Sequence, residues 1–103
     1  AFRELLGRIG SEIKNSSGKI RIEGHTDNVK IAFSDRFMSN WDLSSARSSS
    51  VAGVLIRDVG IELDRLIVAG YSDSRPIATN ESVSGRAANR RIEIIVRGSS
   101  EGS

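Results

Sequence analysis

Cysteine is absent from this chain of 103 residues, and proline, tryptophan and histidine each occur once. Without cysteine the chain forms neither disulfides nor thiolate-metal sites, so a hydrophobic core must supply its stability. No apolar run approaches the roughly 20 residues that span a bilayer, and no charged-then-apolar signal segment opens the chain. Hydrophobic residues at 38% and charged residues at 27% are typical of a globular protein. We therefore expect one small folded domain.

The charges of the chain are nearly balanced, with 15 Lys and Arg against 13 Asp and Glu and a net charge of +2. Such a balance argues against a nucleic-acid or membrane footprint unless the basic residues cluster. Four arginines do lie late in the chain, at Arg86, Arg90, Arg91 and Arg97. Strand alternation separates Arg90 from Arg91 and puts Glu93 on the face of Arg91. We interpret this segment as two salt-bridged, solvated faces and expect no nucleic-acid partner.

Hydrophobic periodicity predicts helices that alternate with short strands. Apolar residues recur at helical spacing near the start of the chain, and later runs alternate or stay apolar as strands do. In chain order we expect a helix over 2–13, a strand over 19–23, a helix over 40–59, a strand over 66–69, a short helix over 85–89 and a strand over 91–97. Ser84 is expected to cap the short helix. No apolar residue occurs over 98–103, which predicts a disordered C-terminal tail.

The helix over 40–59 has a marked start and a marked end. Ser39, followed three residues later by Asp42, resembles a capping box, and Gly60 is a typical helix stop. Arg47 falls in the second or third turn. Residues at helical spacing predict one packed face, made of Leu43, Ala46, Ser50, Val51, Val54 and Leu55.

The first strand ends at Gly24, so the next three side chains, His25, Thr26 and Asp27, sit at its C-terminal end. If the Asp27 carboxylate and the Arg47 guanidinium converge near one cleft, together they can grip a ligand that carries both an ammonium and a carboxylate. The pair therefore predicts a zwitterion site. The same two charges can instead form a buried salt bridge that only ties the strand to the helix, and their spacing does not separate the two interpretations.

Several of these residues form a recognisable pattern. T-D followed by L-S-x-x-R-x-x-x-V-x-x-x-L occurs as Thr26-Asp27, Leu43-Ser44, Arg47, Val51 and Leu55, and G-R-A-A-N-R-R-I-E-I follows over 85–94. The pattern resembles the OmpA-like peptidoglycan-binding domain, and the resemblance covers most of the chain, from about residue 2 to residue 96. Within that family, R-F-M-S-N-W-D-L-S-S-A-R over 36–47 is most similar to MotB-type flagellar stator proteins. A similar sequence occurs in the envelope-anchoring subunits of type VI secretion systems.

This resemblance implies an α/β fold, a two-layer sandwich of helices on one face of a mixed β-sheet with at least three strands. Residues 1–97 would form the domain and 98–103 its tail. Family members usually have another strand before the first helix, and that first strand has no counterpart in this sequence. An exposed sheet edge invites pairing with another chain, so a homodimer is one expectation.

The resemblance also implies a ligand and its contacts. The expected function is non-covalent binding of the diaminopimelate-containing stem peptide of peptidoglycan, which anchors an envelope protein to the cell wall. Arg47 would hold a carboxylate through two parallel hydrogen bonds, and Asp27 would accept from an ammonium. Carried over position by position, the expected peptidoglycan-binding residues are Asp27, Arg47, Asn40, Thr26, Leu43 and Arg90. The family usually has Ala after the motif arginine, whereas this chain has Ser48.

By the same resemblance, the domain is expected in the periplasm, with its parent protein anchored in the inner membrane through a segment absent from this chain. Peptidoglycan and envelope or flagellar motor proteins would be its partners, and no cofactor is implied. The alternative is an interaction or dimerisation module of an envelope machine, such as a type VI secretion anchoring subunit. Its contact surface would be the loop that carries Phe33, Phe37, Met38 and Trp41. Those side chains either face a partner or anchor the loop to the core.

Catalysis and metal binding are not expected. His25 and Asp27 point to the same side of a strand, but no particular serine is placed within reach of the imidazole, and no G-x-S-x-G elbow is present. One histidine and no cysteine leave a zinc ion to be held by carboxylates and water, which is a poor ligand set. His25 is expected to orient the end of the strand.

Overall fold

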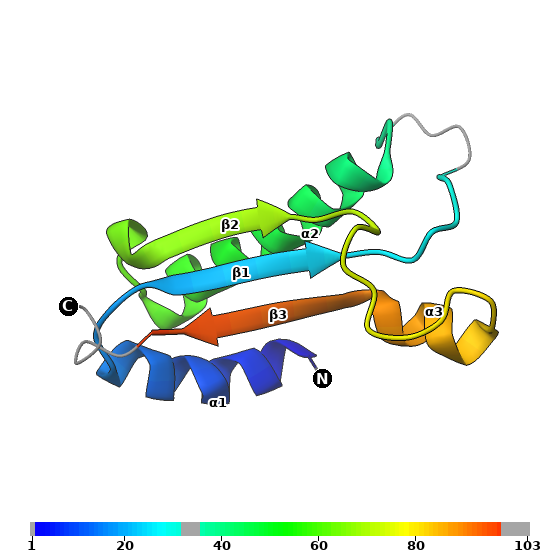
Figure 1. Ribbon diagram of the computed structural model, residues 1–103. Coiled ribbons are helices and arrows are strands. Elements are labelled where there is room, and N and C mark those ends of the chain that lie inside the picture. The colour runs from blue at the N-terminus through cyan, green and yellow to red at the C-terminus, as the bar shows by residue number, and fades with distance from the viewer. Residues whose placement is uncertain (1, 32–35, 98–103) are drawn as a thin grey trace.

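The computed structural model describes residues 2–31 and 36–97 (Figure 1). Helices and strands follow in the order α1 (Phe2–Asn15), β1 (Ile20–His25), α2 (Asn40–Val54), β2 (Leu66–Gly70), α3 (Val83–Asn89) and β3 (Arg91–Val96). A π-helical turn at Leu55–Val59 extends α2, and a 3-10 turn at Leu63–Arg65 leads into β2. The order of elements predicted by periodicity is confirmed. The tail over 98–103 and Phe33 lie outside the described residues.

Strand β1 is the centre of a three-stranded sheet with the order β2-β1-β3. It runs parallel to β2, with Gly24 opposite Gly70, and antiparallel to β3, with Ile22 opposite Ile94. Helix α2 lies behind the sheet in Figure 1 and packs on β1 and β2. Parallel β1 and β2 need such a crossover, because a tight turn can join only antiparallel strands. The expected α/β class, with helix packed on a mixed sheet, is confirmed.

The hydrophobic core lies between β1 and the helices. Aliphatic side chains of β1 alternate with charged ones, so Ile20 and Ile22 point toward α2 and are fully buried. The buried cluster consists of Ile13, Ile20, Ile22, Val51, Ala52, Leu55 and Ile61.

Within the described residues, no helix combines the length and apolar character needed to cross a membrane.

Helix α2 begins where the sequence predicts, but its buried face differs from the predicted one. The Ser39 hydroxyl accepts a hydrogen bond from the backbone N–H of Asp42 at 3.3 Å and caps the helix. Ser50 and Leu43 were expected in the packed face, yet Ser50 is exposed and Leu43 is half-buried. The residues of α2 that are buried are Ser44, Ser48, Val51 and Ala52.

Two glycines explain why serines occupy that face. A Cβ atom at Gly24 would collide with the carbonyl oxygen of Ser44 and the hydroxyl of Ser48, and one at Gly70 would collide with Ser45. The helix therefore approaches the strands too closely for large side chains. The Ser48 hydroxyl uses this proximity to hydrogen-bond the carbonyl oxygen of Ala69 at 2.7 Å.

Helix α3 begins two residues earlier than predicted. Ser82, not Ser84, is the cap, because its hydroxyl accepts from the backbone N–H of Gly85 at 2.9 Å and Val83 is the first helical residue. Glycine suits position 85 in this first turn because the Cβ atom of any other residue would collide with the carbonyl oxygen of Thr79. The prediction of Ser84 was wrong because several serines surround the helix start and the spacing alone does not select one.

The segment before α2 and the first turn of that helix carry Phe37, Met38 and Trp41. The side chain of Met38 is 91% exposed and that of Trp41 is 54% exposed, while Phe37 is half-buried. Of the two interpretations, anchoring of the loop to the core by these side chains is therefore wrong for Met38 and Trp41.

Candidate functional site

The site is built where β1 ends, beside the segment that follows β2. The backbone N–H of Thr26 donates to the carbonyl oxygen of Ser72 at 2.8 Å, so pairing continues beyond the last residues of the sheet. Ser72 adopts a left-handed conformation with φ of 57° and is held there by a second bond, from its own N–H to the Ser44 hydroxyl at 3.0 Å. The Thr26 hydroxyl donates to the carbonyl oxygen of Asp27 at 2.8 Å. Thr26 thus fixes the backbone that carries the candidate carboxylate.

Both oxygens of the Asp27 carboxylate have partners. Oδ1 accepts from the backbone N–H of Val29 at 3.0 Å, and Oδ2 accepts from Nη1 of Arg90 at 2.6 Å. The Asp27 side chain is only 10% exposed, whereas that of Arg90 is 44% exposed. The anticipated salt bridge between Asp27 and Arg47 is therefore not the one that forms, because Arg90 occupies the outer carboxylate oxygen.

Arg90 reaches Asp27 because the end of α3 is held rigidly. Asn89 is completely buried, and its side-chain oxygen accepts from the N–H groups of Ile77 and Ala78 at 2.8 and 3.0 Å. Its amide nitrogen donates to the carbonyl oxygen of Ala78 and to the side chain of Asn80 at 3.0 and 2.8 Å. Every hydrogen-bonding position of the amide is used, so the loop after β2 and the start of β3 are tied together at the residue before Arg90.

Asn40, the first residue of α2, closes the same corner. Its side-chain amide donates to the carbonyl oxygen of Val29 at 3.1 Å and lies 3.5 Å from that of Asp27. Asn40 also lines a hollow of about 340 Å³ together with Ser72 and Asp73. Thr26, Asp27, Asn40 and Arg90 are thus brought together at one end of the sheet.

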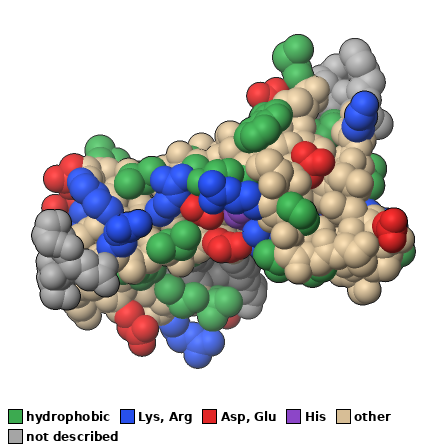
Figure 2. Space-filling model, viewed as in Figure 1, with side chains coloured by type: hydrophobic (Ala, Val, Ile, Leu, Met, Phe, Trp, Pro, Cys, Tyr) green, Lys and Arg blue, Asp and Glu red, His purple; other side chains and the backbone are tan. Residues whose placement is uncertain are grey.

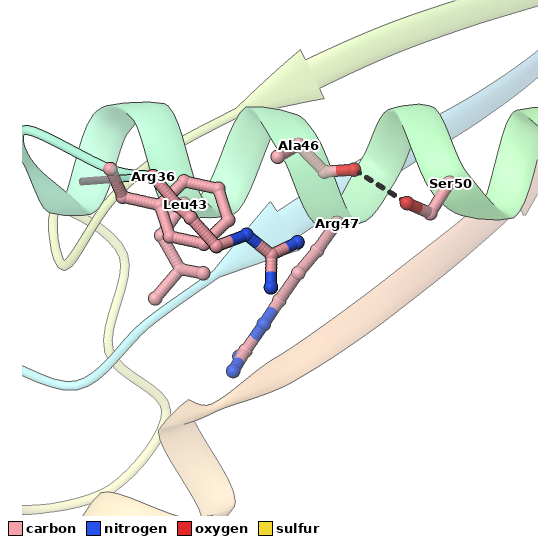
Figure 3. A pocket seen from close by; sticks show the side chains of 6 residues that line it. Arg36, Leu43, Ala46, Arg47 and Ser50 are labelled. Atoms are coloured by element: carbon pink, nitrogen blue, oxygen red, sulfur yellow. Dashed lines mark hydrogen bonds between the residues drawn. The ribbon is translucent and has the colours of Figure 1, made fainter. Parts of the chain in front are cut away.

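Arg47 and Leu43 lie in a neighbouring hollow of about 620 Å³ on the exposed side of α2 (Figure 3). Arg36 enters this hollow from the loop, and the side chains of Arg36 and Arg47 both extend into it. Its lining consists of Arg36, Phe37, Leu43, Ala46, Arg47 and Ser50. No residue in the described part of the chain forms a hydrogen bond or ion pair with the Arg47 guanidinium, so its donors face solvent.

The six predicted site residues therefore fall into two groups, one around Asp27 and one around Arg47. Sequence reasoning missed Arg36, because it lies in an irregular loop where no periodicity indicates a direction. It also missed the ion pair of Asp27 with Arg90, which are 63 positions apart. Only the G-R-A-A-N-R-R stretch singled out by the resemblance pointed to Arg90.

The sheet face that points away from α2 carries a second group of charges. We call this group the charged ladder, and it consists of Arg21, Glu23 and His25 of β1 with Arg91 and Glu93 of β3. Arg21 donates to Glu23 at 2.6 Å, and Arg91 donates to Glu93 at 2.5 Å. The expected salt bridge of β3 therefore forms, but the Arg91 side chain is only 16% exposed and is not solvated as expected. Burial alone would raise the pKa of Glu23, but the hydrogen bond and charge of Arg21 hold this pKa below its ordinary value. Burial, with the charge of Arg91, lowers the pKa of His25.

Known proteins share both this sequence and this fold. Residues 1–90 match the OmpA family. Motility protein B of Bacillus subtilis is 38% identical over 89 residues, which make up 84% of this chain and 34% of that protein. The chain thus spans about a third of that relative's length.

Two solved structures superpose closely on this chain. The cell wall anchor of the type VI secretion system of Pseudomonas aeruginosa has a TM-score of 0.86 and 43% identity, covering 94% of this chain and 66% of the other. The periplasmic domain of Helicobacter pylori MotB has a TM-score of 0.84 and 29% identity, covering 94% of this chain and 62% of the other.

The family match, the similar sequences and the shared fold together define a domain of the OmpA/MotB-like peptidoglycan-binding class. This chain belongs to the OmpA family. Its relatives include periplasmic domains of envelope proteins and cell wall anchors rather than enzymes.

Proposed function

We propose that this chain binds the diaminopimelate-containing stem peptide of peptidoglycan non-covalently, with Arg47 holding a carboxylate and Asp27 accepting from an ammonium. The observation that carries the proposal is the exposed Arg47 guanidinium, which faces a hollow with its hydrogen-bond donors directed to solvent. A planar guanidinium donates two parallel hydrogen bonds to one carboxylate, so this position suits an anionic ligand group. Leu43 lines the hollow beside it and offers apolar contact.

Arg90 acts in this proposal as a movable partner of Asp27. The Asp27 carboxylate is nearly buried, and the half-exposed Arg90 guanidinium lies on its outer oxygen. A ligand ammonium can take over that oxygen when Arg90 turns outward into solvent, since the ammonium replaces the charge-assisted hydrogen bond that Arg90 gives up. Thr26 and Asn40 hold the segment that carries this carboxylate. The Thr26 hydroxyl donates to the backbone carbonyl of Asp27, and the Asn40 amide donates to that of Val29.

The expected loss on removing Arg47 follows from its two hydrogen bonds. Hydrogen bonds to charged groups contribute about 1.5–3 kcal/mol each, so the loss of both, about 3–6 kcal/mol, should weaken wall binding by Arg47→Ala at least about a hundredfold. Co-sedimentation with purified diaminopimelate-type peptidoglycan measures this. Arg57→Ala is the matched control, because Arg57 is an exposed arginine in the turn that extends α2 at its other end.

Retention of the unchanged chain and of Arg57→Ala, with loss of Arg47→Ala, is the expected result. Arg47→Lys should also bind poorly, since an ammonium cannot form the two parallel bonds. Wild-type chain that stays in the supernatant would refute wall binding, and equal retention of Arg47→Ala would refute the assigned site.

For the whole protein we propose an envelope component held at the cell wall by this domain, formed by residues 1–97 with 98–103 as a tail. It would lie in the periplasm, with its parent protein anchored in the inner membrane. A flagellar stator subunit that contacts other motor proteins is the first candidate, and similarity to Motility protein B supports it. The domain would act by binding, without catalysis.

The second candidate is an interaction module that pairs with a second copy or with an envelope partner, as in a type VI secretion anchor. The exposed Met38 and Trp41 favour it, because two large apolar side chains near each other in sequence are left in solvent. Sedimentation equilibrium of Trp41→Ala separates the candidates. Self-association that depends on Trp41 but not on Arg47 would support the module, and a monomeric wild-type chain would exclude the homodimer.

A further inference from the structure

The charged ladder lies on the sheet face opposite α2 and takes no part in the proposed wall contacts. Figure 2 shows this face from the front: blue and red side chains cross its middle, and the purple of histidine shows among them. The chain has one histidine, so the purple atoms belong to His25. Charged groups of both signs therefore surround a single buried imidazole.

Sheet register brings three metal-binding groups together on this face. Glu23 and Glu93 are directly opposite each other in the β1–β3 pair, and His25 follows Glu23 on the same side of β1. Nε2 of His25 lies 3.5 Å from Oε1 of Glu23 and 3.9 Å from Oε2 of Glu93. One ligand atom from each residue lies within 4.8 Å of the others. Tetrahedral ligands about 2.1 Å from a zinc ion are about 3.4 Å from one another, so the imidazole–carboxylate distances need to shorten by at most about 0.5 Å and the distance between the carboxylates by at most about 1.4 Å.

A second and independent observation concerns His25 itself. Its side chain is 2% exposed, neither ring nitrogen makes a hydrogen bond of ordinary geometry, and Nε2 meets only the two carboxylates, at 3.5 and 3.9 Å. Buried polar atoms are nearly always satisfied, so an unpartnered imidazole directed at two carboxylates requires an explanation. The ring stacks on Tyr71 with centroids 5.3 Å apart, which fixes its plane.

The two arginines of the charged ladder fit an outer layer around such a site. Two carboxylates directly opposite each other repel, and each is balanced by the arginine two positions before it on its own strand. Arg21 also donates to the Tyr71 hydroxyl, and Arg91 donates to the carbonyl oxygen of Arg75 at 3.0 Å. Because they have these further partners, the arginines stay in place and orient the carboxylates while an ion binds, as outer-layer groups do in metal sites.

From this geometry we propose that Glu23, His25 and Glu93 bind a divalent transition-metal ion, with Zn²⁺ as the probe. A nitrogen ligand favours ions such as Zn²⁺ over Mg²⁺ or Ca²⁺, which prefer oxygen alone. Three protein ligands leave a fourth position for water. From composition, one histidine with carboxylates and water was expected to be a poor zinc set. That expectation did not include the pairing of β3 with β1, which places Glu93 beside Glu23 and His25. The site is independent of the proposed wall binding.

NMR of the single histidine ring tests the proposal. Zn²⁺ is titrated into the untagged chain at pH 7 in a buffer that does not chelate it, and the ring signals belong to His25 because no other histidine exists. We expect a saturable shift at one ion per chain, reversed by a chelator, and no shift with Mg²⁺. Glu93→Gln should weaken Zn²⁺ binding about 10- to 100-fold or more, since even outer-layer changes weaken metal sites that much.

Two further variants complete the test by calorimetry. His25→Phe keeps a ring to stack on Tyr71 but removes both nitrogens, so it should lose the site while remaining folded. Glu12→Gln, an exposed carboxylate change on α1, should bind Zn²⁺ as the unchanged chain does. Absence of saturable Zn²⁺ binding, or equal binding by Glu93→Gln, would overturn the proposal. A His25 signal that responds to acid but not to Zn²⁺ would overturn it as well and would make the cluster a proton site.

Discussion

Gly24→Ala is expected to destabilise the protein strongly, although it adds a single methyl group. The added Cβ would collide with the backbone carbonyl oxygen of Ser44 and with the Ser48 hydroxyl. A hydroxyl can rotate away, but a helix carbonyl moves only if α2 itself moves. The cost should therefore reach the upper end of the range for overpacked cores, about 3 kcal/mol.

The loss is large relative to the whole stability of a small domain. Folded domains are typically stable by about 5–15 kcal/mol, and in a chain of this size each kcal/mol corresponds to roughly 4–8 °C. Thermal unfolding followed by circular dichroism should therefore show a melting temperature lower by roughly 12–24 °C.

Gly7→Ala is the matched control. It is the same substitution within α1, where a new Cβ atom meets no other atom within 4 Å. Removing a glycine from a helix interior should raise stability by about 0.5–1 kcal/mol, so the two variants are expected to move in opposite directions. A melting temperature of Gly24→Ala equal to that of the unchanged chain would refute the close approach of α2 to β1.

Three further predictions concern single side chains. Ser82→Ala should destabilise the chain by about 1 kcal/mol through loss of the α3 cap, whereas Ser84→Ala should change stability by less than about 0.5 kcal/mol; equal effects in denaturant titrations would contradict the assigned cap. Asn89→Ala removes four hydrogen bonds of a buried amide and should cost roughly 2–3 kcal/mol by the same measurement; a smaller loss than for Ser82→Ala would argue against its bridging role. Arg90→Gln frees the outer oxygen of Asp27, so this variant should sediment with peptidoglycan at least as well as the unchanged chain; weaker sedimentation would instead make Arg90 a direct ligand contact.

Local features of the fold could be predicted from the sequence because each depends on neighbours along the chain. The alternation over 91–97 identified β3, and Ser39 with Asp42 marked the start of α2. The buried face of α2 could not be predicted in the same way. Small polar residues such as Ser44 and Ser48 indicate a surface unless it is known that glycines of other strands lie against them.

The site could be predicted only in its parts. Asp27 and Arg47 are candidates by residue type, position and family resemblance, but the ion pair of Asp27 with Arg90 depends on how α3 and β3 return to the end of β1. The cluster of Glu23 with Glu93 depends in turn on the register of two strands far apart in the chain. Pairing register is a tertiary property, and no local pattern of a single sequence specifies it.

The two chemically different faces of β1 have a consequence for folding accuracy. A shift of the strand by one residue would turn Ile20 and Ile22 to solvent and bury Arg21 and Glu23 beneath α2, whose buried face consists of small polar and apolar residues. The same shift would separate Arg21 from the Tyr71 hydroxyl and His25 from Glu93 on the other side. A misaligned β1 would therefore lose stability in two ways, because aliphatic surface would be exposed and charged side chains would be buried. The central strand has one register that satisfies both of its faces.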